Sequence, residues 1–329
     1  MSVRRLESML PFLSRDLAID LGTAGTRIHV RGRGIMLNEP SLVAVDPDTG
    51  QIVAFGAEAT KTTGMVTVRP VRNGVIVEPD AARRMLRHFV HKVHGHPFAR
   101  PRMTIAVPGG ITSIERKVAL EAAYEAQARQ ITFMEQPLAA ALGAGLELAD
   151  PIAAIVVDVG RGTTDVAAVS MGRAVAVRSM RTGGEAMDSA IKLEVRRAYG
   201  VVIDDRTAES LKQQLGVACE PLAGCRMEVS GAHPRHGAPM YATVSAECVY
   251  EAIDPAVRAI VEAVREVIES CSPEIAADVA RRGLLLTGGG ARLSGLPRRL
   301  RRDLGIPVAR VDTPEHTVAL GLGLWAARN

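Results

Sequence analysis

The chain has 329 residues, of which 47% are hydrophobic and 23% charged, a length and composition typical of a globular protein with two domains or lobes. Only 3% of the residues are aromatic, so the core must consist mainly of Ala, Val, Leu and Ile. The net charge of +4 gives little electrostatic reason for nucleic-acid binding, and we expect none. The four cysteines have no C-x-x-C spacing, which indicates reduced thiols and a cytoplasmic protein.

Residues 1–15, MSVRRLESMLPFLSR, read as a tail ahead of the folded chain. Its apolar residues recur at helical spacing beside two arginines, which is typical of a short amphipathic helix on an anionic membrane. Pro11 would disturb such a helix, so a frayed tail is the alternative. The apolar part is too short for a signal peptide. No run of 18 apolar residues occurs, and the sequence predicts no membrane-spanning helix.

Strand and helix patterns alternate from Asp16 onward. LAIDLGTAGTRIHV and SLVAVDPDTGQIVAFG read as strands, and helices are predicted over Asp80–Val93 and Ser113–Ala128. MTIAVP before the second helix and QITFME after it also read as strands. This alternation predicts an α/β fold with a mixed or mostly parallel sheet.

Two segments of the chain, Ala18–Val30 and Val156–Val169, share one template. Each has an apolar strand, an Asp, a glycine turn, a Thr and a second strand. The matched positions are Asp20 with Asp158, Gly22 with Gly160, and Thr26 with Thr164. A duplication is the economical explanation, and it predicts two related lobes that each present one hairpin to a shared cleft.

The hairpin turns have the residue types that bind phosphate. Glycines let backbone N–H groups approach an anion closely, and Thr23, Thr163 and Thr164 add hydroxyl donors. Asp20 and Asp158 end the first strands, so their carboxylates should point toward the same place. Carboxylates beside phosphates usually hold a hydrated Mg²⁺.

Gly288, Gly289 and Gly290 follow another apolar strand and precede a predicted helix start. The Rossmann pattern G-x-G-x-x-G fails because residue 293 is Leu. Three consecutive glycines let a flat ring lie against the backbone, which suits a purine.

Two phosphate hairpins and a TGGG segment resemble the superfamily of actin, heat-shock chaperones and sugar kinases. The sequence is most similar to the MreB-type bacterial actins. The resemblance covers about Asp16 to Trp325, in blocks that include DLAIDLGTAGTRIHVRGRGIMLNEPSLVAV, VPGGITSIERKVALEAAYEAQAR, MEQPLAAALGAGL, RTGGEAMDSAI and SPEIAADVARRGLLLTGGGARLSGL.

The resemblance implies an actin-like ATPase fold of four subdomains, in two related lobes around a nucleotide cleft. Lobe I would comprise residues 16–150 and 312–329, and lobe II residues 151–311. The resemblance also implies binding of ATP and Mg²⁺, and self-association into filaments on the inner face of the cell membrane. These filaments would guide the cell-wall synthesis machinery.

Family roles carry over to the matching positions. The nucleotide contacts implied are Asp20, Gly22, Thr23, Ala24, Gly25, Gly160, Arg161, Gly162, Thr163, Thr164, Gly184, Glu209, Lys212, Gly288, Gly289 and Gly290. Gln136, Asp158 and Thr163 would act on the terminal phosphate, and Asp20 and Asp158 would hold Mg²⁺ through water. Glu209 and Lys212 match the ribose and adenine contacts, although by themselves they would read as a surface ion pair.

Two residues near the expected terminal phosphate depart from the family pattern. Gln136 stands where the family usually has Glu, and an amide can orient a water but is a negligible base, which predicts slow hydrolysis. Arg161 replaces a turn glycine; it could contact phosphate, occupy the space of phosphate and metal, or project into solvent. A non-hydrolysing actin-like protein that acts as an interaction or regulatory partner is therefore the alternative function.

Overall fold

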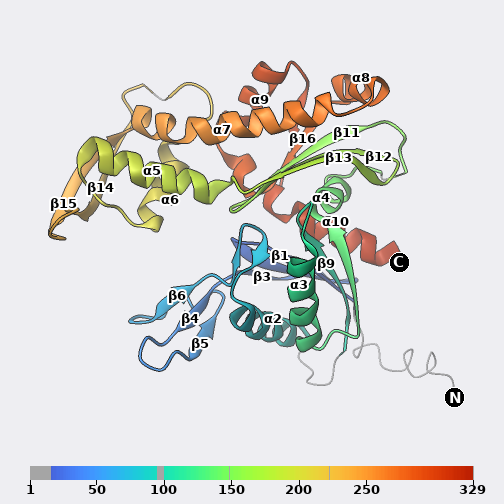
Figure 1. Ribbon diagram of the computed structural model, residues 1–329, viewed down its shortest axis with the longest axis horizontal. Coiled ribbons are helices and arrows are strands. Elements are labelled where there is room, and N and C mark those ends of the chain that lie inside the picture. The colour runs from blue at the N-terminus through green and yellow to red at the C-terminus, as the bar shows by residue number, and fades with distance from the viewer. Residues whose placement is uncertain (1–15, 95–99, 148, 222, 329) are drawn as a thin grey trace.

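The computed structural model describes residues 16–94, 100–147, 149–221 and 223–328, within which two five-stranded sheets form the two halves of the molecule (Figure 1). The first sheet has the order β10-β9-β1-β2-β3, with bounds Gln130–Glu135, Arg102–Val107, Leu17–Leu21, Gly25–Val30 and Gly34–Pro40. The second has the order β13-β12-β11-β16-β17, with bounds Arg173–Met180, Thr164–Ser170, Ala154–Val159, Leu284–Thr287 and Val308–Arg310.

The two sheets repeat one topology. β1 pairs with β2 in an antiparallel hairpin and with β9 in parallel, and β11 pairs in the same way with β12 and β16. Every residue of β1 and of β11 is buried, as expected for apolar strands covered on both faces. The predicted α/β fold with mixed sheets is therefore confirmed.

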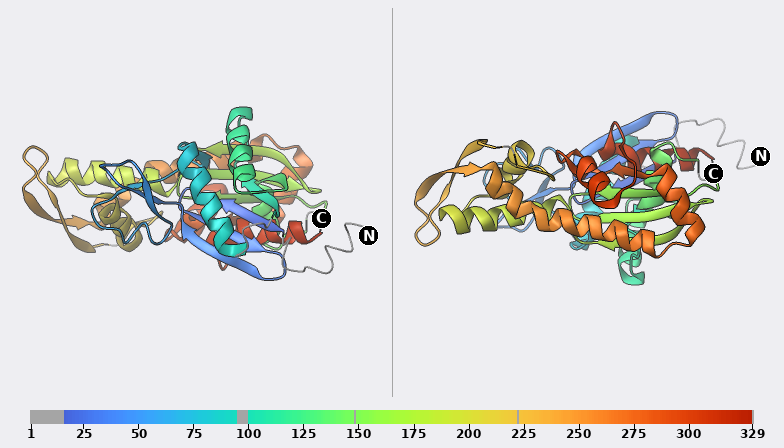
Figure 2. Two further views of the ribbon diagram at one scale, coloured as in Figure 1. Left: turned by 90° about the horizontal axis from the view of Figure 1, so that it is seen from below. Right: turned by 90° about the horizontal axis from the view of Figure 1, so that it is seen from above.

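Helices α2 (Pro79–His94) and α3 (Ser113–Glu125) cover the outer face of the first sheet, as the view from below in Figure 2 shows. Thr112 and Glu115 form a capping box that starts α3. The helix ends three residues before the predicted Ala128, because Gln127 adopts a left-handed φ of 69°. Short strands form a small sheet, β5-β4-β6, and a hairpin, β7–β8, with bounds Ile52–Phe55, Val43–Val45, Val66–Val68, Val71–Arg72 and Val75–Ile76.

The long helix α7 (Ala246–Glu269) runs along the outer face of the second sheet (Figures 1 and 2). Its buried residues recur at helical spacing, which places one apolar face on the sheet. Helices α5 and α6 and the β14–β15 hairpin extend from one end of this half (Figure 1), whereas α8 packs on β11 and α9 on β17. Their bounds are Gly184–Tyr199, Asp205–Leu215, Arg226–Ala232, Pro239–Ser245, Pro273–Arg282 and Leu296–Leu304.

Helices α4 (Gln136–Gly143) and α10 (Thr317–Arg328) lie between the two sheets. They cross at backbone contact, because a Cβ on Gly321 would lie 1.7 Å from the Ala139 carbonyl oxygen. The core around them is rich in alanine, which agrees with the aliphatic core expected from the composition. α10 also packs on β1, β2 and β9.

We propose that lobe I comprises residues 16–150 and 312–329, and lobe II residues 151–311. The packing of α10 on the first sheet supports joining residues 312–329 to lobe I. The amphipathic segment expected over residues 1–15 lies outside the described residues. No helix in the described part of the chain is long and apolar enough to span a membrane.

Candidate nucleotide-binding site

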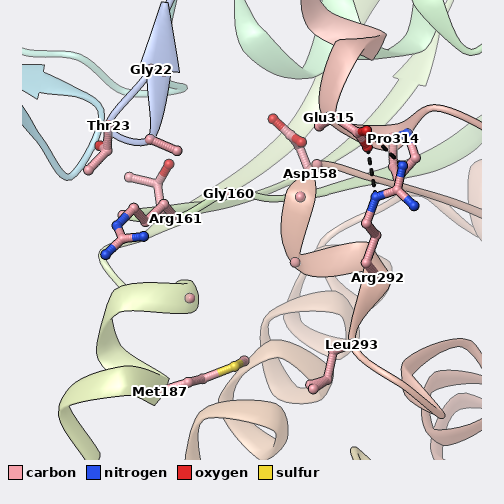
Figure 3. Close-up of a pocket in the computed structure, with 18 of the residues that line it drawn as sticks. Gly22, Thr23, Asp158, Gly160, Arg161, Met187, Arg292, Leu293, Pro314 and Glu315 are labelled. Carbon is pink, nitrogen blue, oxygen red and sulfur yellow. Dashed lines mark hydrogen bonds and ion pairs between the residues drawn. The ribbon is translucent and has the colours of Figure 1, made fainter. Parts of the chain in front are cut away.

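The turns of the two matching hairpins meet at one cavity of about 420 Å³ (Figure 3). In the first turn the Gly22 N–H donates to the Gly25 carbonyl oxygen over 3.2 Å, and in the second the Gly160 N–H donates to the Thr163 carbonyl oxygen over 2.8 Å. The same hydrogen bond therefore closes both turns. The first turn is also tied to the β7–β8 turn, because the Gly74 N–H donates to Thr23 Oγ1 over 3.0 Å.

The cavity brings together every predicted site residue except one. Those that line it are Asp20, Gly22, Thr23, Ala24, Gly25, Gln136, Asp158, Gly160, Arg161, Gly162, Thr163, Gly184, Glu209, Lys212, Gly288, Gly289 and Gly290. Thr164 is fully buried, and its Oγ1 donates to the Thr182 carbonyl oxygen over 2.6 Å. The hydroxyl that was expected to donate to phosphate is therefore used within the fold. Thr163, in the turn just before β12, is the threonine of this pair that lines the cavity.

The three consecutive glycines lie directly on the end of β11. A Cβ on Gly288 would lie 2.3 Å from the Val159 carbonyl oxygen, and one on Gly290 would lie 2.4 Å from Val159 Cγ1. A Cβ on Gly289 would meet nothing within 4 Å, so this residue borders open space. A single 3-10 turn, η1 (Gly289–Arg292), follows instead of the predicted helix start, and α9 begins only at Leu296.

Buried carboxyl groups crowd the ends of the hairpin strands. Asp20 and Asp158 are only 6% and 8% exposed. Burial raises the pKa of Asp158 to about 7, and the charges of Asp165 and Asp20 act in the same direction. Burial also raises the pKa of Asp20, although Arg27 Nη1, 3.3 Å from Asp20 Oδ2, opposes the shift. Thr287 Oγ1 lies 3.1 Å from Asp158 Oδ1. An added cation would relieve the repulsion among the carboxylates of Asp158, Asp165 and Asp20.

Asp165 joins the second hairpin to the other half of the molecule. Its Oδ1 accepts hydrogen bonds from the Gly109 N–H, in the loop between β9 and α3, over 3.2 Å and from Ser179 Oγ over 2.6 Å. Burial raises the pKa of the Asp165 carboxyl. This contact was not predicted, because it depends on how the two sheets face each other.

The Arg161 side chain turns inward from the second hairpin and is 13% exposed. Its Nη1 lies 3.2 Å from both carboxylate oxygens of Glu209, and its Nη2 lies 3.9 Å from Asp188 Oδ2. The alternative in which Arg161 projects into solvent is therefore wrong, because these carboxylates hold the guanidinium. Contact with phosphate remains a prediction.

Asp188 is a buried acid of the site that sequence reasoning missed. Lys212 Nζ lies 2.7 Å from Asp188 Oδ1 and donates to the Gly184 carbonyl oxygen over 3.0 Å. Burial raises the pKa of Asp188, and Lys212 opposes the shift. Lys212 therefore forms its ion pair with Asp188 of α5 and not with Glu209. The surface ion pair between Glu209 and Lys212 does not form. The sequence signal for Asp188 was its place beside the apolar residues Met187, Ile191 and Val195, which form the buried face of α5.

Gln136 is the first residue of α4, and its side chain is 7% exposed at the cavity. The neighbouring Glu135 ends β10 and is exposed. The two neighbouring side chains thus differ in exposure, and the amide of Gln136 is the group that borders the cavity.

Arg292 and Glu315 were also missed, and both line the cavity. Arg292 Nε and Nη2 donate to the two carboxylate oxygens of Glu315 over 3.0 and 2.7 Å (Figure 3). The pair raises the pKa of Arg292 and lowers that of Glu315. A charged residue two positions after three glycines was the only local signal.

The repeated sheets and the cavity between their matching hairpins define an actin-like ATPase fold. The structure is similar to that of MreB5 of Spiroplasma citri bound to ADP, with TM-score 0.88, 30% identity, and coverage of 96% of this chain and 97% of that one. The same protein bound to AMPPNP gives TM-score 0.89, 30% identity, and coverage of 95% and 96%. A MamK double helical filament, at 22% identity and TM-score 0.82, covers 95% of this chain and 98% of its own and shares the fold.

Sequence comparisons identify the family. Residues 14–329 match the family described as MreB/Mbl protein. The chain is 40% identical over 329 residues to the cell shape-determining protein MreB of Escherichia coli (strain K12), covering 97% of this chain and 95% of the relative. It is 39% identical over 317 residues to the cell shape-determining protein Mbl of Bacillus subtilis (strain 168), covering 94% and 95%. The chain belongs to the MreB/Mbl family of actin-like cytoskeletal proteins.

Proposed function

We propose that the protein is a cytoplasmic, ATP-binding actin homologue that forms filaments on the inner face of the cell membrane and guides cell-wall synthesis and cell shape. The observation that carries this proposal is the convergence of both hairpins on one cavity. The similar MreB5 structures hold ADP and AMPPNP, and the relatives are named cell shape-determining proteins. The similar MamK filament supports self-association.

The described residues fit a nucleotide with Mg²⁺. The glycines of both turns leave room for an anion, and Gly162 has no space for a side chain, since a Cβ there would lie 2.7 Å from Thr23 Oγ1. Asp20 and Asp158 would hold the ion through water, and burial of these carboxyls favours a compensating cation. The ion would neutralise phosphate charge when bound.

Gln136 would orient a water at the terminal phosphate without acting as a base, so we propose slow ATP hydrolysis. Phosphate release should rise in Gln136→Glu, which introduces a carboxylate at the cavity. Glu135→Gln, at the exposed neighbouring position, is the matched control and should leave the rate unchanged. Slow turnover would be contradicted if the unaltered protein released phosphate fast and Gln136→Glu did not raise the rate.

Sedimentation tests the filament proposal. The full chain should pellet with ATP more than with ADP or without nucleotide, and anionic liposomes should increase the pelleted fraction. Removal of residues 1–15 should abolish only the liposome effect if this segment binds membrane. Failure to pellet under every condition would contradict filament formation, and ATP binding would then be tested separately by calorimetry.

A further inference from the structure

The Arg292–Glu315 ion pair borders the cavity but belongs to none of the proposed phosphate, metal or ribose contacts. The side chains are 56% and 27% exposed. Exposed ion pairs contribute little to folding stability. The bidentate geometry nevertheless fixes the plane of the guanidinium, because Nε and Nη2 both bind the same carboxylate.

Both residues of the ion pair belong to short turns that are linked to the glycine segment. Arg292 ends η1, and Glu315 lies in the second 3-10 turn, η2 (Pro314–His316). The two turns are also joined by the backbone, since the Gly288 N–H donates to the Pro314 carbonyl oxygen over 2.9 Å. The ion pair is therefore held close to Gly289, which faces open space.

This part of the cavity has the properties that a flat aromatic ring requires. Gly289 offers bare backbone, and the side chains of Met187 and Leu293 also line the cavity (Figure 3). The two hydrogen bonds of the ion pair use donors at the edge of the Arg292 guanidinium and neither uses its flat faces. Guanidinium faces stack on aromatic rings, whereas the compact ammonium of lysine has no flat face to stack.

We propose that the Arg292–Glu315 ion pair recognises the purine base of the bound nucleotide. The base lies on Gly289, Arg292 stacks on it, and Glu315 holds the guanidinium in place. This inference rests on the proposed nucleotide site. Arg292 should favour purine over pyrimidine nucleotides, because a larger ring offers more stacking area. Stacking does not separate adenine from guanine.

Calorimetric titration of the full chain with ATP, CTP and inorganic tripolyphosphate, each with Mg²⁺, tests the proposal. Arg292→Lys and Arg292→Leu should weaken ATP binding about fivefold, the size expected for a guanidinium on an aromatic ring, and CTP binding by less. Glu315→Gln should weaken ATP binding by an intermediate factor. Tripolyphosphate has no base, so its affinity should not change in any of these variants. Arg298→Leu is the matched control, because Arg298 is 67% exposed on α9 and should leave all three affinities unchanged.

Several outcomes would overturn the inference. Full ATP affinity in Arg292→Lys would mean that charge alone suffices, and this variant retains the charge that the local fold needs. Equal losses for ATP and tripolyphosphate would assign Arg292 to the phosphates. If the unaltered protein binds ATP and all the variants bind it equally well, only the base-recognition inference fails. If the unaltered protein binds no ATP, the proposed function itself fails.

Discussion

Asp158→Asn should stabilise the nucleotide-free protein while weakening its binding of ATP with Mg²⁺. The Asp158 carboxyl is buried beside Asp20 and Asp165, and its pKa rises from 3.8 to about 7. Ionisation is therefore less favourable in the folded state than in the unfolded chain. At about 1.4 kcal/mol for each pKa unit, the destabilisation reaches about 4 kcal/mol once both states are ionised.

The sign of the pH dependence follows from the raised pKa. The stabilising contribution of protonated Asp158 is fully present below the unfolded pKa of 3.8 and is lost as the pH rises through about 7. Asparagine cannot ionise, but its amide oxygen can still accept a hydrogen bond from Thr287. The stability advantage of Asp158→Asn should therefore grow between pH 4 and pH 8.

Urea unfolding of the nucleotide-free protein at several pH values measures this advantage. Asp48→Asn, in an exposed turn, is the matched control and should show no pH-dependent difference from the unaltered protein. An Asp158→Asn advantage that stays constant or shrinks with rising pH would refute the reasoning. Calorimetry should find weaker binding of ATP with Mg²⁺ in the same variant, because the carboxylate proposed to hold the ion is gone.

Three further predictions concern the two threonines of the second hairpin, its arginine, and the contact between α4 and α10. Thr164→Val should lower the free energy of unfolding by about 1–2 kcal/mol, because a buried hydrogen bond is lost, and should leave ATP affinity unchanged. Thr163→Val should mainly weaken ATP binding, because Thr163 lines the cavity. Urea unfolding and calorimetry measure the two effects, and the same behaviour in both variants would contradict the assignment. Arg161→Gly should lower the free energy of unfolding by about 2 kcal/mol, and a double-mutant cycle with Glu209→Gln that gives no coupling would exclude the ion pair as the cause. Gly321→Ala should cost about 3 kcal/mol because of overlap with a backbone carbonyl, and an unchanged melting temperature would contradict it.

The parts of the fold that repeat along the chain could be predicted from the sequence. The hairpins of the two sheets have local signals, since an apolar strand, a glycine turn and a second strand are read within a dozen residues. The strand patterns also gave the mixed α/β fold. The left-handed Gln127 that ends α3 had no such signal, and the predicted helix ran past it.

The ion pairs of the site could not be predicted, because each depends on elements distant in the sequence. Arg161 meets Glu209 only when the second hairpin packs against α6, and Arg292 meets Glu315 only when η1 and η2 lie side by side. Thr164 shows a further limit. The hairpin motif contains two adjacent threonines, and only the folded hairpin, in which Thr164 begins β12 and Thr163 belongs to the turn, decides which of them faces the cavity.

The pattern of pairing within the cavity indicates where a cation would stabilise the protein most. Among the described acids that line it, Asp20, Glu209 and Glu315 each lie within 3.3 Å of an arginine nitrogen. Asp158 instead has a neutral neighbour, the Thr287 hydroxyl, and two nearby carboxylates raise its pKa further. A cation beside Asp158 would lower the pKa of this carboxyl. Binding of the cation at Asp158 should therefore release more protons at pH 7 than binding of the same cation beside an acid that is already ionised. Proton release on addition of ATP with Mg²⁺ should therefore be smaller in Asp158→Asn, and equal release from both proteins would place the cation elsewhere.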